Sequence, residues 1–127
     1  MRIAIDTNRY VDFAKGLPEA VSRLRAVDQI LIPLIVLAEL RAGFLGGSRA
    51  PENEANLVRF LNSPRVDVLL ADEETTHHYA RLFHQLRRQG TPIPANDVWI
   101  AALVVQHQLY LFARDDHFDH LPQIPRL

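Results

Sequence analysis

Short apolar segments, each separated from the next by a stretch of helical length, are the feature that most restricts the fold of this chain. Four of them are expected to form strands, at residues 3–5, 30–32, 66–70 and 109–112. They lack the polar alternation of a strand with one solvated face, so both faces of the sheet should be covered. Helices between successive strands imply parallel crossovers. This pattern predicts an α/β fold, a three-layer α/β/α sandwich with a mainly parallel sheet.

Helices are predicted between the strands from caps, chain breakers and apolar spacing. Gly16 should end the first helix, Pro18 should begin the second, and Asn96 should cap the last. The segment 98–105 is apolar at every position, so that helix should be enclosed. The predicted helices cover residues 8–15, 19–27, 34–45, 52–61, 72–89 and 97–108.

Length and charge limit the classes of protein that this chain can represent. Its 127 residues predict a single domain over residues 1–127. Fourteen Lys and Arg against fifteen Asp and Glu give a net charge of −1, which excludes nucleic-acid binding by bulk positive charge. The absence of cysteine excludes disulfides, thiolate metal sites and a cysteine nucleophile. No signal-peptide core follows Met1 and no segment could span a bilayer, so we expect a soluble, cytoplasmic protein without membrane attachment.

Two aspartates should lie at the carboxyl edge of the sheet, where parallel sheets form their ligand sites. Asp6 directly follows the first predicted strand, and Asp115 follows the last one after two residues. Taken singly, each is better explained as a turn or helix-capping residue.

Glu39 is harder to explain as a structural residue. It shares a helical face with Ile35 and Val36, and an unpaired carboxylate on a buried face costs several kcal/mol. A salt bridge to Arg41 or Arg114, or a tilt toward solvent, is the structural alternative. We favour a functional role.

Asp97 stands at the start of the apolar helix, where the helix dipole alone would favour an acidic residue. Because that helix should be enclosed, its first turn is expected near the sheet edge that holds Asp6 and Asp115. Two like charges about 4 Å apart repel by roughly 4 kcal/mol at an effective dielectric of 20, so such a cluster needs a cation or shared protons. Oxygen ligands select Mg²⁺ or Mn²⁺, and carboxylate-held Mg²⁺ is typical of phosphoryl transfer.

Four segments, in the right order along the whole chain, resemble the PIN-domain family, and specifically the VapC-type toxins of toxin–antitoxin pairs. The opening Asp6-Thr7-Asn8, the helical glutamate in Leu37-Ala38-Glu39-Leu40 and the segment 92–102 around Asn96-Asp97 match three acidic motifs. Residues 111–115 followed by His117-Phe118 resemble the fourth. One departure is Ala113, where the family usually has Thr or Ser, which puts a hydroxyl contact at that position in doubt.

The resemblance implies an endoribonuclease that depends on Mg²⁺ or Mn²⁺ and cleaves RNA with a metal-activated water. Its catalytic and metal-binding set would be Asp6, Glu39, Asp97 and Asp115, with support from Thr7, Asn8, Asn96 and Asp116. Basic residues next to the acidic motifs are candidate RNA contacts: Arg9, Lys15, Arg41 and Arg114. The implied partners are a small antitoxin protein that inhibits the active site and a second copy of the chain in a homodimer.

Other classes remain as alternatives. A catalytically idle PIN fold that only binds RNA or protein is the main one, and the presence of all four acids argues against it. A phospho-receiver domain needs a lysine after its last strand, whereas the sole lysine is Lys15. A haloacid-dehalogenase-type phosphatase needs a second aspartate at Asn8. We interpret His117 and His120 as part of a solvated turn rather than a transition-metal site, and Trp99 as a core residue.

Overall fold

A four-stranded parallel sheet organises the protein, as seen in a computed structural model that describes residues 1–127. The strands are β1 (Arg2–Ile5), β2 (Gln29–Pro33), β3 (Val66–Leu69) and β4 (Tyr110–Phe112), in the spatial order β3-β2-β1-β4. In the registers of the central strand, Ile3 lies opposite Ile30 on one side and Tyr110 on the other. The predicted parallel sheet is confirmed.

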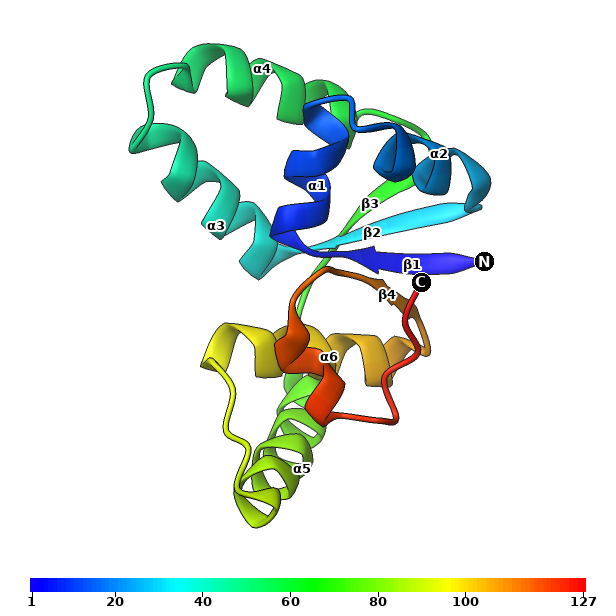
Figure 1. Cartoon of the computed structure of the whole chain (residues 1–127), viewed down its shortest axis with the longest axis vertical. Helices are drawn as coiled ribbons and strands as arrows, with labels where there is room; N and C mark the ends of the chain where they lie inside the picture. Colours follow the sequence, from blue (N-terminus) through cyan, green and yellow to red (C-terminus); the bar gives the residue numbers. More distant parts are fainter.

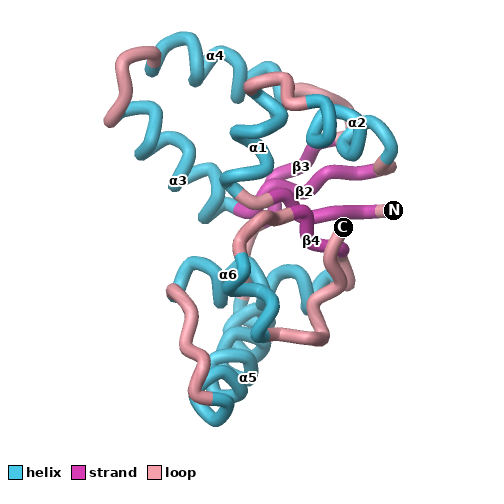
Figure 2. Tube along the Cα trace, viewed as in Figure 1, coloured by secondary structure: helices cyan, strands magenta, loops and turns pink.

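Six α-helices cover the two faces of the sheet, which completes the predicted three layers (Figures 1 and 2). One face carries α1, α2, α3 and α4, and the other carries α5 and α6. Right-handed crossovers explain this division, because the chain moves from β1 to β3 in one direction and then returns past β1 to reach β4. The helices are α1 (Thr7–Ala14), α2 (Pro18–Ala26), α3 (Leu34–Leu45), α4 (Ala50–Leu61), α5 (Glu73–Gln89) and α6 (Ala95–His107), and a 3₁₀ helix, η1 (Asp116–His120), follows β4.

The core lies between these layers and is formed largely by β1 and α6. Ile3, Ala4 and Ile5 have no exposed surface, and residues 100–104 of α6 are all buried. Trp99 on the same helix is half-buried against Tyr79 of α5, with ring centroids 4.4 Å apart. The predicted enclosure of the apolar helix is therefore confirmed.

The predicted strand at residues 66–70 differs from the others because it forms an edge of the sheet. Asp67 and Val68 are exposed, and β3 ends at Leu69. The opposite edge, at β4, is extended by an isolated parallel bridge between Leu111 and Arg126.

Helix caps show where the sequence prediction was wrong. Asn96 does not cap α6: the helix begins at Ala95 after the extended residue Pro94, and Asn96 is an exposed residue of the first turn. Pro94 takes the N-cap position, and because proline has no side-chain acceptor the first turn of α6 has no side-chain cap. Asp6, not Asn8, marks the start of α1, because its carboxylate accepts the Thr7 N–H. No helix is long and apolar enough to cross a membrane.

Candidate active site

The site lies where the order of the sheet reverses, at the carboxyl ends of the adjacent strands β1 and β4. Asp6 follows β1 directly, and its backbone N–H donates to the Phe112 carbonyl of β4 at 3.0 Å. Asp115 follows β4 after Ala113 and Arg114. In open parallel sheets a crevice forms at such a switch point, because the connections leave the two strands on opposite faces. The topology therefore brings together residues from the two ends of the sequence.

Asp6 is the most buried acid of the site. Its side chain caps α1 by accepting the Thr7 N–H at 2.7 Å, and only 6% of the residue is exposed. Burial raises the pKa of Asp6 to about 6, although the Thr7 N–H acts in the opposite direction. The negative charges of Asp97, Glu39 and Asp115 contribute to this rise, which reaches about 6 with all causes together. All four predicted acids are thus close enough to interact.

Glu39 reaches the site from α3 and is held by a hydroxyl group. The Thr7 hydroxyl donates to Oε1 of Glu39 at 2.9 Å. Neither arginine considered as its salt-bridge partner contacts it, because Arg41 pairs with Glu54 and Arg114 pairs with Asp12. Glu39 is therefore half-buried beside the other acids without a cationic partner.

Asp97 and Asp115 meet at a histidine that the sequence analysis assigned to a solvated turn. Nδ1 of His117 lies 2.7 Å from Oδ2 of Asp97 and 3.0 Å from Oδ1 of Asp115. The His117 backbone N–H also donates to Asp115 Oδ1 at 2.9 Å, so Asp115 caps η1. One ligand atom from each of the three residues can be chosen so that all lie within 4.8 Å of one another. The signal in the sequence for a site at His117 was the Asp-x-His spacing of Asp115 and His117. The contact of His117 with Asp97 joins residues 20 positions apart, which this spacing does not indicate.

The ionisation of this trio follows from its geometry. Burial raises the pKa of Asp97, while its hydrogen bond with His117 opposes that shift. The hydrogen bond to Asp97 raises the pKa of His117, and the charge of Asp115 adds to the effect. The two carboxylates therefore favour the protonated form of His117, and in that form the imidazole offsets part of their negative charge.

We expect the metal-free protein to lose stability as the pH rises through about 6. The pKa of Asp6 is higher in the folded protein than its ordinary value of 3.8, so protonation of Asp6 favours the folded state. Its contribution is largest below about pH 4 and is lost above pH 6; His117, whose pKa is also raised, acts in the same direction near neutral pH. Asp6→Asn should therefore be more stable than wild type at pH 7 by on the order of 2–3 kcal/mol.

The measurement is denaturant unfolding of both proteins in EDTA between pH 4 and 8. The side-chain oxygen of Asn can still accept the Thr7 N–H, so the helix cap is retained. Parallel pH profiles for the two proteins would contradict the assignment of a raised pKa to Asp6.

The remaining predicted residues occupy different surroundings. Asn8, Asn96 and Asp116 are exposed near the acids. Asp119 is exposed on η1 and pairs with Arg126 at 3.0 Å, whereas Asp115 supplies the cap of η1.

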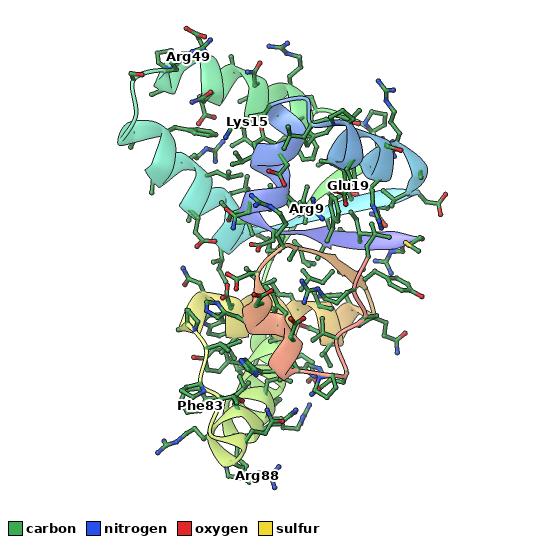
Figure 3. All side chains as sticks on the ribbon, in the orientation of Figure 1. Arg9, Lys15, Glu19, Arg49, Phe83 and Arg88 are labelled. Carbon is green, nitrogen blue, oxygen red and sulfur yellow. The ribbon has the colours of Figure 1, made fainter.

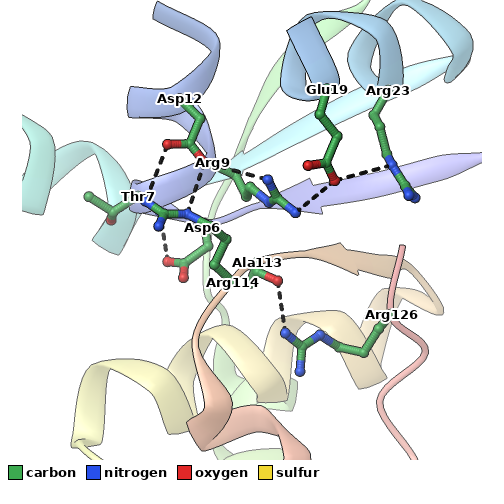
Figure 4. Close-up of polar contacts among 9 residues, drawn as sticks. All are labelled: Asp6, Thr7, Arg9, Asp12, Glu19, Arg23, Ala113, Arg114 and Arg126. Carbon is green, nitrogen blue, oxygen red and sulfur yellow. Dashed lines mark hydrogen bonds and ion pairs between the residues drawn. The ribbon is translucent and has the colours of Figure 1, made fainter. Parts of the chain in front are cut away.

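Three of the four basic residues proposed as RNA contacts pair with acids of the protein. Arg9 is directed inward, where its guanidinium lies 4.6 Å from the centroid of the Phe112 ring and pairs with Asp12 and Glu19 (Figure 4). Arg41 pairs with Glu54 on α4. Arg114 is exposed but pairs with Asp12, and Lys15 is exposed without an acidic partner.

A groove leads away from the acids between α1, α3 and α4. It has a volume of about 560 Å³, and Thr7 and Glu39 lie in its lining together with Lys15 and Arg49. Figure 3 shows Lys15 and Arg49 on this side of the molecule, far from Arg88 on α5. The groove therefore connects the acidic site to Lys15 and to the ion pair between Arg49 and Glu52.

This arrangement defines an α/β protein with a carboxylate-lined site at the switch point of a parallel sheet. The PIN domain profile matches residues 3–124. Ribonuclease VapC1 from Haemophilus influenzae (strain R2866) is 33% identical, with coverage of 87% of this chain and 89% of the relative. Ribonuclease VapC5 from Mycobacterium tuberculosis is 30% identical over 74% of each chain.

Solved structures show the same likeness. VapBC2 from Rickettsia felis, bound to a DNA fragment from its promoter, matches with a TM-score of 0.89 and 25% identity over 100% of this chain and 98% of that one. VapBC-1 from nontypeable Haemophilus influenzae matches with a TM-score of 0.87 and 25% identity over 100% and 97%. The chain belongs to the PIN-domain family.

Proposed function

We propose that this protein is a Mg²⁺- or Mn²⁺-dependent endoribonuclease and the toxin of a toxin–antitoxin pair. The observation that carries the proposal is the convergence of Asp6, Glu39, Asp97 and Asp115 at the switch point. The names of the relatives support the activity, since they are called ribonucleases. A structural neighbour from the VapBC family of toxin–antitoxin systems, VapBC-5 from Mycobacterium tuberculosis, supports the biological role.

The residues of the site fit a hard divalent cation. Four carboxylates supply oxygen ligands, and the charges of Asp97, Glu39 and Asp115 add to the burial that raises the pKa of Asp6. Asp97 and Asp115 would hold the ion with Asp6 and Glu39, and Nδ1 of His117 lies within the same group. A bound Mg²⁺ or Mn²⁺ polarises the phosphodiester and lowers the pKa of an attacking water.

The contribution of the chain is to hold these carboxylates in fixed positions. The Thr7 N–H orients Asp6, and the Thr7 hydroxyl orients Glu39. His117 links Asp97 to Asp115 across the crevice. Fixed groups of this kind need no reorganisation during the reaction, which makes their electrostatic effect larger than in water. Ala113 offers no hydroxyl group, so any polar contact with the phosphate at that position must come from elsewhere.

RNA would approach along the groove between α1, α3 and α4. The net charge of −1 leaves binding to local cations, and Lys15 is exposed in the groove that Glu39 also lines. Arg9, Arg41 and Arg114 contribute less to this proposal, because each already pairs with an acid of the protein.

The test is cleavage of a structured RNA by the purified protein. We expect cleavage with Mg²⁺ or Mn²⁺, no cleavage in EDTA, and recovery when Mn²⁺ is added back. RNA binding without cleavage under all metal conditions would contradict the enzyme and favour the catalytically idle alternative. Mapping the ends produced from total RNA identifies the substrate.

We further propose an antitoxin partner that closes the acidic crevice, with a basic side chain such as arginine facing the carboxylates. Addition of the purified antitoxin to the same assay should stop cleavage at a one-to-one ratio, whereas an unchanged rate would contradict the inhibitory role.

The family likeness also leads us to propose a homodimer in the cytoplasm. Light scattering that gives the mass of one chain would contradict the dimer.

A further inference from the structure

The segment that carries Asp115 belongs to no helix or strand. Residues 113–115 connect β4 to η1 without regular secondary structure. A carboxylate on such a segment keeps its position only if other groups hold the backbone. The groups that hold residues 113–115 therefore bear directly on how well the site is formed.

Arg126 contacts this segment from the side of the β4 edge. Its Nη2 donates to the Ala113 carbonyl at 2.8 Å and to the Asp115 carbonyl at 3.3 Å. Figure 4 shows the guanidinium facing Ala113 from a separate segment of the chain. One planar group thus bridges the first and last residues of the connecting segment.

Arg126 is itself fixed by the sheet. The Leu111 N–H donates to the Pro125 carbonyl at 2.8 Å, and the Leu127 N–H donates to the Leu111 carbonyl at 3.0 Å. The guanidinium also lies 5.7 Å from the centroid of the buried Phe118 ring. The position of the donor is therefore set by β4, the strand that precedes the segment it holds.

A second arginine holds the same segment from the side of α1. Arg114 pairs with Asp12, with Nε–Oδ2 at 2.9 Å and Nη2–Oδ1 at 3.2 Å (Figure 4). Asp12 is only 6% exposed, so this carboxylate is fixed in the protein interior. Arg126 acts on the backbone of the segment, whereas the Asp12 pair acts on a side chain.

We propose that Arg126 is a positioning residue for the metal site: it holds the backbone of residues 113–115 so that the Asp115 carboxylate faces Asp97 and His117. The inference rests on the proposed function, because it assigns Asp115 to metal binding. Outer residues that orient metal ligands typically affect metal affinity by 10- to 100-fold. Arg126 is suited to this role because its rigid planar guanidinium directs Nη2 at both carbonyls while Nη1 pairs with Asp119, an arrangement that a flexible lysine ammonium reproduces less well.

The test compares Mn²⁺ binding in the wild type and three variants by titration calorimetry and electron paramagnetic resonance. Arg126→Met removes the donors while keeping apolar contact with Phe118, and should raise the Kd for Mn²⁺ about 10-fold or more. Arg126→Lys keeps one donor group and should lie between Met and wild type. Asp119→Asn is the matched control: it removes the ion pair with Arg126 but neither carbonyl contact, and should stay within about twofold because that carboxylate is exposed.

A second measurement does not depend on metal. The backbone N–H of His117 donates to Asp115 Oδ1, so hydrogen exchange of this backbone N–H in EDTA reports whether Asp115 is in place. We expect exchange to be about 10-fold faster in Arg126→Met and unchanged in Asp119→Asn. If Arg126→Met fails to fold by circular dichroism, the comparison of Arg126→Lys with Asp119→Asn decides the question.

Wild-type Mn²⁺ affinity and wild-type exchange in the Arg126 variants would overturn the inference, and so would equal losses in Arg126→Met and Asp119→Asn. A wild-type protein that binds no Mn²⁺ would instead contradict the proposed function, and the exchange measurement would still decide whether Arg126 positions Asp115.

Discussion

Asp97→Asn should lower the rate of RNA cleavage by at least about 100-fold at saturating Mn²⁺. The substitution preserves the shape of the side chain but removes a charge from the centre of the site, where Asp97 contacts His117 and raises the pKa of Asp6. Asp6→Asn should cause a loss of the same size, since Asp6 is the most buried acid of the four. The measurement is the single-turnover rate on an RNA whose cleavage position has been mapped.

Asp67→Asn is the matched control for this loss. Asp67 is an exposed aspartate on β3, at the edge of the sheet away from β4, and an asparagine oxygen can still accept the hydrogen bond from Gln29. Its rate should equal that of the wild type. Cleavage that persists unchanged in Asp97→Asn would show that the activity comes from a contaminating nuclease.

Among the three acids that follow β4, Asp115→Asn should cost at least about 100-fold in cleavage, and Asp119→Asn should stay within a few-fold of wild type. Asp115 contacts His117 in the crevice, whereas Asp119 is exposed and pairs with Arg126. Asp116 is exposed on η1, so its replacement by Asn should also have an effect of only a few-fold. Rates for all three variants at saturating Mn²⁺ make the comparison.

The placement of Asp115 in the crevice requires that the Asp115 variant loses far more cleavage activity than the Asp116 and Asp119 variants. A large loss at Asp119 together with a normal rate at Asp115 would show that the wrong carboxylate has been placed in the crevice. Thermal unfolding in EDTA should accompany the rates, so that a loss of folded protein is not mistaken for a loss of catalysis.

Residues with a strong local signal were predictable from the sequence. Asp6 stands directly after an apolar strand, a position that places it at the carboxyl edge of the sheet. Glu39 is a charged residue on an apolar helical face, which is unusual for a residue with only a structural role. The parallel sheet could be predicted from the apolar runs, because a strand that is buried on both faces has apolar residues at consecutive positions. The edge position of β3 was less evident, since Asp67 was the single polar residue in that run.

Residues whose role depends on a distant partner were not predictable. Asp12 contacts Arg114 across 102 residues, and Arg126 contacts Ala113 through a carbonyl that carries no sequence information. Arg9 was a candidate RNA contact because it is a basic residue next to an acidic motif, but its guanidinium lies inside the protein beside the Phe112 ring. Such contacts are decided by tertiary packing, which local propensity and spacing do not record.

The position of β4 beside β1 also has a consequence for protein synthesis. Asp6 leaves the ribosome well before β4, the strand that lies beside β1. More than a hundred further residues must be made before β4, Asp115 and His117 are complete. Until that strand docks, the nascent chain holds at most part of the acidic set. For the ribonuclease activity proposed above, cleavage would therefore have to wait until β4 has been made and has docked beside β1.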